Sequence, residues 1–201
     1  MTDVLIPGGR DVRGTLEMPD GEANAIVVAC PPHPQHGGSR TDSRLVAVAE
    51  TLRESGIACL RFDYGPWDDG YGEREDVRNA VRWASERYDR VGLFGYSFGA
   101  TLALIATDDL ETVDAVSALA PTARLEEDLD AVESLETLSV SLQILYGERD
   151  GTVDWEPIVD RARSRGDEVV SIPGDHFFVG QNGTITDAVS EFFASGLLEA
   201  E

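Results

Sequence analysis

The stretch that decides the fold of this 201-residue chain runs Arg90-Val91-Gly92-Leu93-Phe94-Gly95-Tyr96-Ser97-Phe98-Gly99-Ala100-Thr101-Leu102-Ala103-Leu104-Ile105-Ala106. Residues 91–94 have the length and apolar character of a buried parallel strand, and small and aliphatic residues follow Gly99 at helical spacing. A Gly-x-Ser-x-Gly turn between a strand and a helix leaves the central serine exposed at its tip. Gly95 and Gly99 have no side chains, so the backbone can approach itself closely. The stretch predicts Ser97 as a nucleophile, and a plain glycine-rich turn is the alternative.

Strands and helices alternate along most of the chain. Residues 4–18, broken by Pro7-Gly8-Gly9, predict two short strands in an antiparallel hairpin at a sheet edge. The other expected strands are 25–30, 57–62, 113–119, 140–146 and 168–172, and the other expected helices are 42–54, 73–88, 125–138, 155–163 and 184–198. This alternation predicts an α/β fold with a mostly parallel sheet covered by helices on both faces, in one domain spanning 1–201.

The charge balance is strongly acidic. The chain has 38 Asp and Glu residues against 16 basic residues, all of them arginine, for a net charge of −22. So negative a field repels nucleic acids and anionic membranes, which excludes both as expected partners. Dispersed acids without lysine resemble the composition of proteins from salt-in halophiles, so we expect the protein to loosen in dilute buffer, where repulsion is unscreened. A moderately acidic protein of ordinary salt tolerance is the alternative.

Two cysteines, Cys30 and Cys59, lie in apolar strand-like runs and are expected to be reduced core thiols. The N-terminus has no basic-then-apolar signal pattern, and no apolar run approaches the length of a membrane span. We therefore expect a soluble cytoplasmic protein. The sequence does not indicate its oligomeric state.

A serine hydroxyl needs a base to accept its proton during attack, and histidine suits this role near neutral pH. His176 follows the last expected strand and is the best candidate among three histidines, although it could simply pack against the two phenylalanines that follow it. The imidazole in turn needs a carboxylate to orient it. Asp150 follows the strand at 140–146, and Asp154 and Asp128 are the alternatives.

The loop after residue 30 reads Pro31-Pro32-His33-Pro34-Gln35-His36-Gly37-Gly38. His33 and His36 have the spacing of a metal-binding pair, but no cysteine or third histidine completes a ligand set, so no metal and no cofactor are expected. Backbone amides of this loop are placed to help stabilise a negative oxygen together with the amide of Phe98. Because prolines have no amide proton, the donors available are His33, which we favour, and Gln35.

With these residues in place the chain resembles the α/β-hydrolase superfamily, and within it small serine hydrolases related to dienelactone hydrolases and esterases. Four segments carry the resemblance, namely 31–38, Gly95-Tyr96-Ser97-Phe98-Gly99, Gly147-Glu148-Arg149-Asp150 and His176-Phe177-Phe178. Pro31 departs from the histidine with which the first segment usually begins. Dienelactone hydrolases proper use a cysteine nucleophile, so their substrate does not transfer to a chain with Ser97.

The resemblance and the residues together predict a hydrolase that cleaves a carboxylic ester, thioester or amide of a small acyl substrate through an acyl-enzyme on Ser97. Residues 121–140 leave room for one helix and not for a large cap, so the site is expected to be open. Tyr64, Trp67, Tyr71 and Tyr96, together with Phe98, are candidates to line it. The alternative is a non-catalytic protein of the same fold that binds a ligand or partner.

Overall fold

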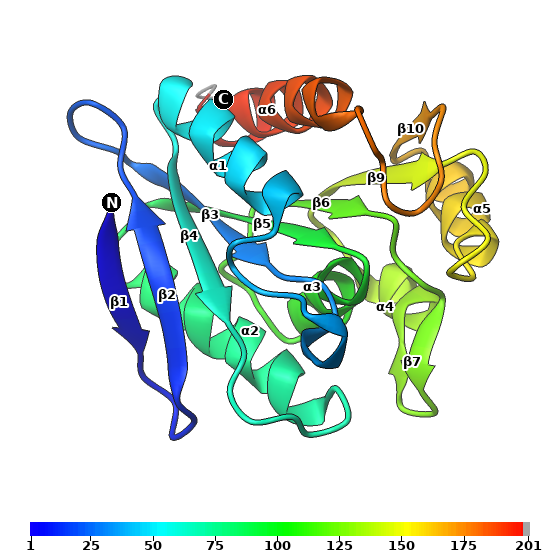
Figure 1. Ribbon diagram of the computed structural model, residues 1–201, viewed down its shortest axis with the longest axis horizontal. Coiled ribbons are helices and arrows are strands. Elements are labelled where there is room, and N and C mark those ends of the chain that lie inside the picture. Colours follow the sequence, from blue (N-terminus) through cyan, green and yellow to red (C-terminus); the bar gives the residue numbers. More distant parts are fainter. Residues whose placement is uncertain (199–201) are drawn as a thin grey trace.

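The computed structural model describes residues 1–198 and contains an eight-stranded sheet in the order β1-β2-β4-β3-β5-β6-β9-β10 (Figure 1). The strands are β1 (Thr2–Ile6), β2 (Val12–Glu17), β3 (Ala25–Cys30), β4 (Ala58–Asp63), β5 (Arg90–Tyr96), β6 (Ala115–Leu119), β9 (Ser141–Gly147) and β10 (Glu168–Ile172). From β4 to β10 all neighbouring strands are parallel, whereas β1 and β2 form an antiparallel hairpin at one edge. The expected mostly parallel sheet and edge hairpin are confirmed.

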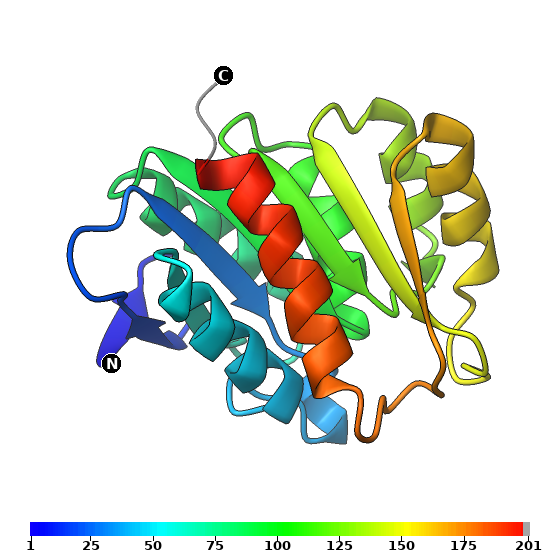
Figure 2. The same ribbon diagram turned by 90° about the horizontal axis from the view of Figure 1, so that it is seen from above.

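Helices cover both faces of the sheet (Figures 1 and 2). One face carries α1 (Ser43–Glu54) and α6 (Asn182–Leu198), and the other carries α2 (Tyr71–Ser85), α3 (Phe98–Thr107), α4 (Ala131–Thr137) and α5 (Glu156–Arg165). Every residue of β3 is buried because both of its faces are covered, which explains its unbroken apolar sequence. Cys30 and Cys59 are free and buried in these cores, as expected.

The segment expected to be one helix at 125–138 is different, and that prediction is wrong. A small hairpin of β7 (Arg124–Glu126) and β8 (Leu129–Asp130) comes first, and α4 begins only at Ala131. The side chain of Asp130 accepts hydrogen bonds from the amides of Val132 and Glu133, so it caps the helix at that point. Asp130 also accepts from Arg124 Nε at 2.9 Å, which closes the hairpin. Capping therefore prevails over the weak helical pattern of 125–130.

The turn from β5 to α3 is as tight as its glycines predict. A Cβ atom on Gly95 would lie 2.3 Å from the carbonyl oxygen of Gly99, and one on Gly99 would lie 2.3 Å from that of Cys30. Neither distance is possible for a side-chain carbon, so only glycine allows α3 to start directly above the ends of β5 and β3. Within residues 1–198 none of the helices has the length and apolar character needed to cross a membrane.

Candidate active site

Four loops that follow parallel strands meet at one edge of the sheet. Ser97 follows β5, Asp150 follows β9, His176 follows β10, and His33 follows β3. The carboxyl ends of parallel strands share one edge, which is where sites in open α/β sheets form. The topology thus brings together side chains that are up to 143 residues apart in the sequence, from His33 to His176.

The three residues proposed for catalysis form one hydrogen-bonded chain. Ser97 Oγ lies 2.9 Å from His176 Nε2, and His176 Nδ1 lies 2.7 Å from Asp150 Oδ2. With Nδ1 protonated, the imidazole donates to the carboxylate and its Nε2 can accept the serine proton. This tautomer is assigned from the hydrogen bonds.

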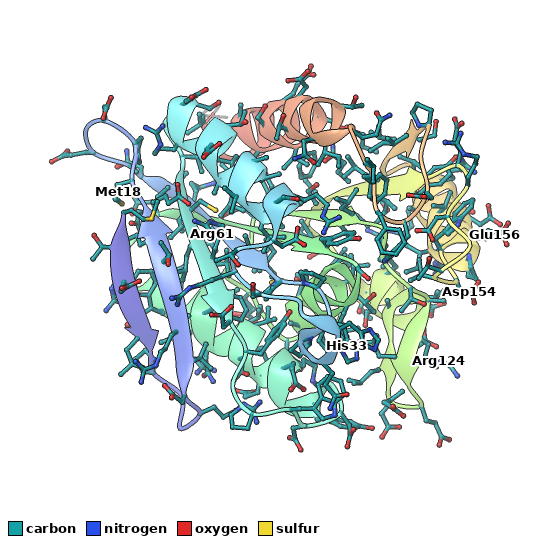
Figure 3. All side chains as sticks on the ribbon, in the orientation of Figure 1. Met18, His33, Arg61, Arg124, Asp154 and Glu156 are labelled. Atoms are coloured by element: carbon teal, nitrogen blue, oxygen red, sulfur yellow. The ribbon has the colours of Figure 1, made fainter. Side chains whose placement is uncertain are left out.

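Asp150 is buried and held from several directions. Its Oδ1 accepts from the amide of Thr152 at 2.9 Å, and its carbonyl accepts from Trp155 Nε1 at 2.9 Å, which leaves Oδ2 for His176. The alternatives considered for this role, Asp128 and Asp154, are both exposed, and the carboxylate that bonds to His176 is that of Asp150. Figure 3 shows Asp154 at the outer side of the molecule.

Ser97 has an unusual backbone conformation, with φ 56° and ψ −118°. A residue other than glycine with positive φ is strained and persists only when its surroundings hold it there. Here the Ser97 amide donates to the carbonyl of Leu119 at 2.8 Å, and the Thr101 amide and hydroxyl both bond to the Ser97 carbonyl. The strain and the fixation together point the hydroxyl at the imidazole.

The loop after β3 forms a short 3₁₀ turn, η1 (Pro34–His36), that decides which of its amides is available. The Gln35 amide donates to Nδ1 of His33 at 3.3 Å, while the carbonyl of His33 accepts from the amides of His36 and Gly38. In the part of the chain that the structure describes, the amide of His33 itself has no acceptor. The Ser97 side chain does not cap α3, so the Phe98 amide at its first turn also lacks a side-chain acceptor.

The imidazole of His33, a residue labelled in Figure 3, is held in an aromatic cluster. Its ring centroid lies 4.4 Å from that of His36, 4.6 Å from Trp67 and 4.8 Å from Phe98. Partial burial, and then repulsion from His36, lower the pKa of His33. Within residues 1–198 no three or more His, Cys, Asp or Glu side chains are arranged to hold a metal ion.

Above Ser97 and His176 lies an open cavity of about 510 Å³. Its apolar wall consists of Pro32, Tyr96, Phe98, Leu125, Val153 and Phe177. Of the four aromatic residues expected to bind substrate, Tyr96 lines this cavity. Tyr64 and Trp67 do not line the cavity and instead pack against the ring of Phe98, each with a ring centroid 5.8 Å from it. Tyr71 is exposed at the start of α2.

Several cavity residues were not found by sequence reasoning. Leu125 lies in the hairpin that was expected to be helical, and Asp42 and Arg44 lie at the start of α1. Asp42 could have been recognised as a helix cap, because aspartate is favoured directly before a helix. No local pattern marks Arg44, since only the tertiary structure places the start of α1 beside the His176 loop.

No protein-family model and no curated protein matches the sequence, whereas many solved structures match its fold. An α/β serine hydrolase homologue from Coxiella burnetii is 25% identical, with a TM-score of 0.82. The match covers 94% of this chain and 96% of the Coxiella chain. An α/β serine hydrolase without a lid from Xanthomonas campestris is 22% identical, with a TM-score of 0.81. The match covers 100% of this chain and 96% of the Xanthomonas chain. A dienelactone hydrolase from Anabaena variabilis is 24% identical, with a TM-score of 0.80. The match covers 98% of this chain and 97% of the Anabaena chain.

The chain therefore has the α/β-hydrolase fold, and its structural neighbours are serine hydrolases, esterases and a dienelactone hydrolase. Within residues 1–198 the segment between β6 and β9 contains only the β7–β8 hairpin and the seven-residue helix α4, which fits the neighbour described as lacking a lid. The resemblance stated from the sequence is confirmed at the level of this class.

Proposed function

We propose that the protein is a serine hydrolase that cleaves a carboxylic ester through an acyl-enzyme on Ser97. The observation that carries the proposal is the unbroken chain from Ser97 Oγ through His176 to Asp150, at 2.9 and 2.7 Å, at the floor of an open cavity. Structural neighbours that are esterases, including one from Pyrococcus furiosus, support the same class of activity.

In the first half-reaction Ser97 Oγ attacks the acyl carbonyl carbon while His176 Nε2 takes the hydroxyl proton. The tetrahedral intermediate collapses, the bond to the alcohol oxygen breaks, and the imidazolium returns the proton to the alcohol. In the second half-reaction water attacks the acyl-enzyme with His176 again as base, releasing the carboxylic acid and free Ser97. Asp150 keeps the imidazole in the required tautomer and stabilises its charged form.

The negative oxygen of the tetrahedral intermediate needs donors on the side of Ser97 away from His176. We assign this role to the amides of Phe98 and His33, because the Gln35 amide is engaged within its own turn. Each such donor contributes about 3–4 kcal/mol to stabilising the transition state. The donor at Phe98 also benefits from the positive end of the α3 dipole.

The cavity supports a small, uncharged acyl substrate. Its wall is mainly apolar and aromatic, and the net charge of −22 repels anions, nucleic acids and anionic membranes. One structural neighbour, Est1E from Butyrivibrio proteoclasticus, has a structure with bound ferulic acid, so an aromatic ester such as methyl ferulate belongs among the substrates to test.

A fluorophosphonate probe tests the proposal, because it reacts with an activated serine. We expect labelling of the wild-type protein in molar KCl and none of Ser97→Ala, together with hydrolysis from a panel of short-chain, aromatic, thioester and aminoacyl-amide substrates. Circular dichroism of both proteins controls for folding. A folded wild-type protein that is not labelled would contradict the proposal and favour a non-catalytic binding protein.

A further inference from the structure

Arg44 is a charged side chain in the wall of the cavity that the proposed reaction does not use. An arginine beside a reactive serine would ordinarily be assigned to a substrate carboxylate. Here, however, its Nε donates to Asp42 Oδ1 at 2.8 Å and its Nη2 donates to Asp42 Oδ2. One edge of the guanidinium is thus closed by a bidentate pair, and its charge is neutralised by Asp42.

The remaining contacts of Arg44 lead to the loop that carries His176. Its Nη1 donates to the carbonyl oxygen of Phe177 at 2.9 Å, and its guanidinium carbon lies 4.1 Å from the centroid of the Tyr96 ring. Such stacking is favourable for a desolvated arginine. Arg44 therefore joins three separate segments, namely the start of α1, the end of β5 and the loop after β10.

Tyr96 makes the second connection to the same loop. Its hydroxyl donates to the carbonyl oxygen of His176 at 2.9 Å, and the side chain is almost completely buried. Burial raises the pKa of Tyr96 to about 12, so the phenol keeps the proton that this hydrogen bond needs. Two stacked side chains thus hold two consecutive carbonyl groups, those of His176 and Phe177.

The loop needs such fixation because its own conformation is unfavourable. Phe178, the next residue, has φ 51°, a left-handed conformation that is strained for a bulky residue and persists only where its surroundings hold it. His176 must also stay within hydrogen-bond distance of both Ser97 and Asp150. A small displacement of this loop would lengthen both hydrogen bonds.

We propose that Arg44 and Tyr96 act as a clamp that positions His176 for proton transfer, and that Arg44 does not bind a carboxylate of the substrate. The inference rests on the proposed function of the same site and adds two positioning residues to it. It also implies that Arg44 gives no preference for esters whose acyl group carries a negative charge, since the guanidinium at the cavity wall is already paired.

Steady-state kinetics with two esters that share a leaving group separate a clamp from an anion receptor. The esters are p-nitrophenyl acetate and mono-p-nitrophenyl glutarate, which carries a free carboxylate. For Arg44→Gln and Tyr96→Phe we expect kcat to fall by about 10- to 100-fold on both esters, as for a misplacement on the order of 1 Å, with KM within about twofold of wild type. The ratio of kcat/KM between the two esters stays at its wild-type value.

Arg53→Gln, which removes a guanidinium from the last turn of the same helix, is the matched control and keeps wild-type kinetics. The double variant Arg44→Gln/Tyr96→Phe loses less than the product of the two single effects, because both side chains hold one loop. If Arg44→Gln lowers kcat/KM only for the glutarate ester, through KM, then Arg44 is an anion receptor and the clamp is wrong.

A spectroscopic readout separates failure of the clamp from failure of the proposed function. In protein with ¹⁵N-labelled histidines, the proton between His176 Nδ1 and Asp150 is observed directly by NMR, and we expect it to exchange with solvent at least tenfold faster in the double variant. Wild-type protein without hydrolysis or probe labelling would overturn the proposed function and leave this measurement intact. Unchanged exchange in a folded double variant would overturn the clamp.

Discussion

Within residues 1–198 two ion pairs of a nitrogen group and a carboxylate are buried on both sides, and they have very different surroundings. At the carboxyl edge of the sheet, His176 and Asp150 have side chains that are 7% and 0% exposed. At the antiparallel end, Arg61 of β4 and Glu17 of β2 are each 6% exposed, with Arg61 Nε 2.9 Å from Glu17 Oε1. Figure 3 labels Arg61 on the side of β1 and β2, away from His33.

Burial and pairing are therefore not what distinguishes a reactive site. A guanidinium group has donors and no acceptor, and that of Arg61 donates to Glu17 and to the carbonyl of Arg40, which hold it in place. The imidazole of His176 donates from one nitrogen to Asp150, and its other nitrogen faces the hydroxyl of Ser97 on a strained turn below the cavity. The pair of Arg61 and Glu17 can only stabilise structure, whereas the pair of His176 and Asp150 can also move a proton.

The largest expected effect is on the pair at the cavity. Asp150→Asn leaves the shape of the side chain but removes the charge and allows the wrong imidazole tautomer, so we expect kcat to fall by about 10³- to 10⁴-fold with little change in KM. Asp154→Asn, which changes an exposed carboxylate of the same loop, is the matched control. Comparable activity of Asp150→Asn and wild type in an ester assay would place the acid elsewhere.

At the pair of Arg61 and Glu17 we expect a loss of stability with little change in activity. Glu17→Ala leaves the buried guanidinium of Arg61 without its carboxylate, and breaking such a pair costs about 3–5 kcal/mol of the free energy of unfolding. Urea denaturation measures this loss, and kcat of the folded fraction stays within about twofold of wild type. A large drop in kcat of folded Glu17→Ala would show that the two regions are coupled.

The dependence of stability on salt concentration distinguishes the two buried ion pairs from the exposed carboxylates of the surface. At a net charge of −22, repulsion among exposed carboxylates destabilises the folded state, and molar KCl screens it because the Debye length falls to about 3 Å at 1 M. We expect the melting temperature to rise by several degrees between 0.1 and 2 M KCl, by similar amounts in wild type and Glu17→Ala, since buried pairs are screened little. A melting temperature that is independent of KCl would contradict the halophilic interpretation of the composition.

Mild acid gives the smallest expected effect, and within it the contribution of His33, at the cavity, can be separated by substitution. The folded-state pKa of His33 is lowered, chiefly by its partial burial, so the unfolded chain binds this proton more readily. The contribution of His33 to stability is complete above about pH 6.5 and is lost as the pH falls through its folded-state pKa. Denaturation at pH 7.5 and pH 5 should show a smaller loss for His33→Gln than for wild type, and equal losses would exclude His33 as the cause.

Much of the fold could be predicted because its signals are local. The apolar run of β3, the glycine pair around Ser97 and the turn residues of the β1–β2 hairpin each specify their structure over a few residues. The failure at 125–138 has the same origin. A weak helical pattern competed there with a cap at Asp130 and an ion pair from Arg124, whose partners the pattern does not reveal.

The sequence by itself determined the class of fold, the order of the elements, and the proposal of Ser97, Asp150 and His176. These depend on short-range sterics and on the rule that parallel strands place their following loops at one edge of a sheet. Only the tertiary structure decided which loop amide is available, which aromatic residues face the cavity, and that Arg44 contacts the loop of His176. The contact between Arg44 and Phe177 joins residues 133 apart in the sequence. Its geometry depends on how α1 and α6 pack on the sheet, which no local pattern encodes.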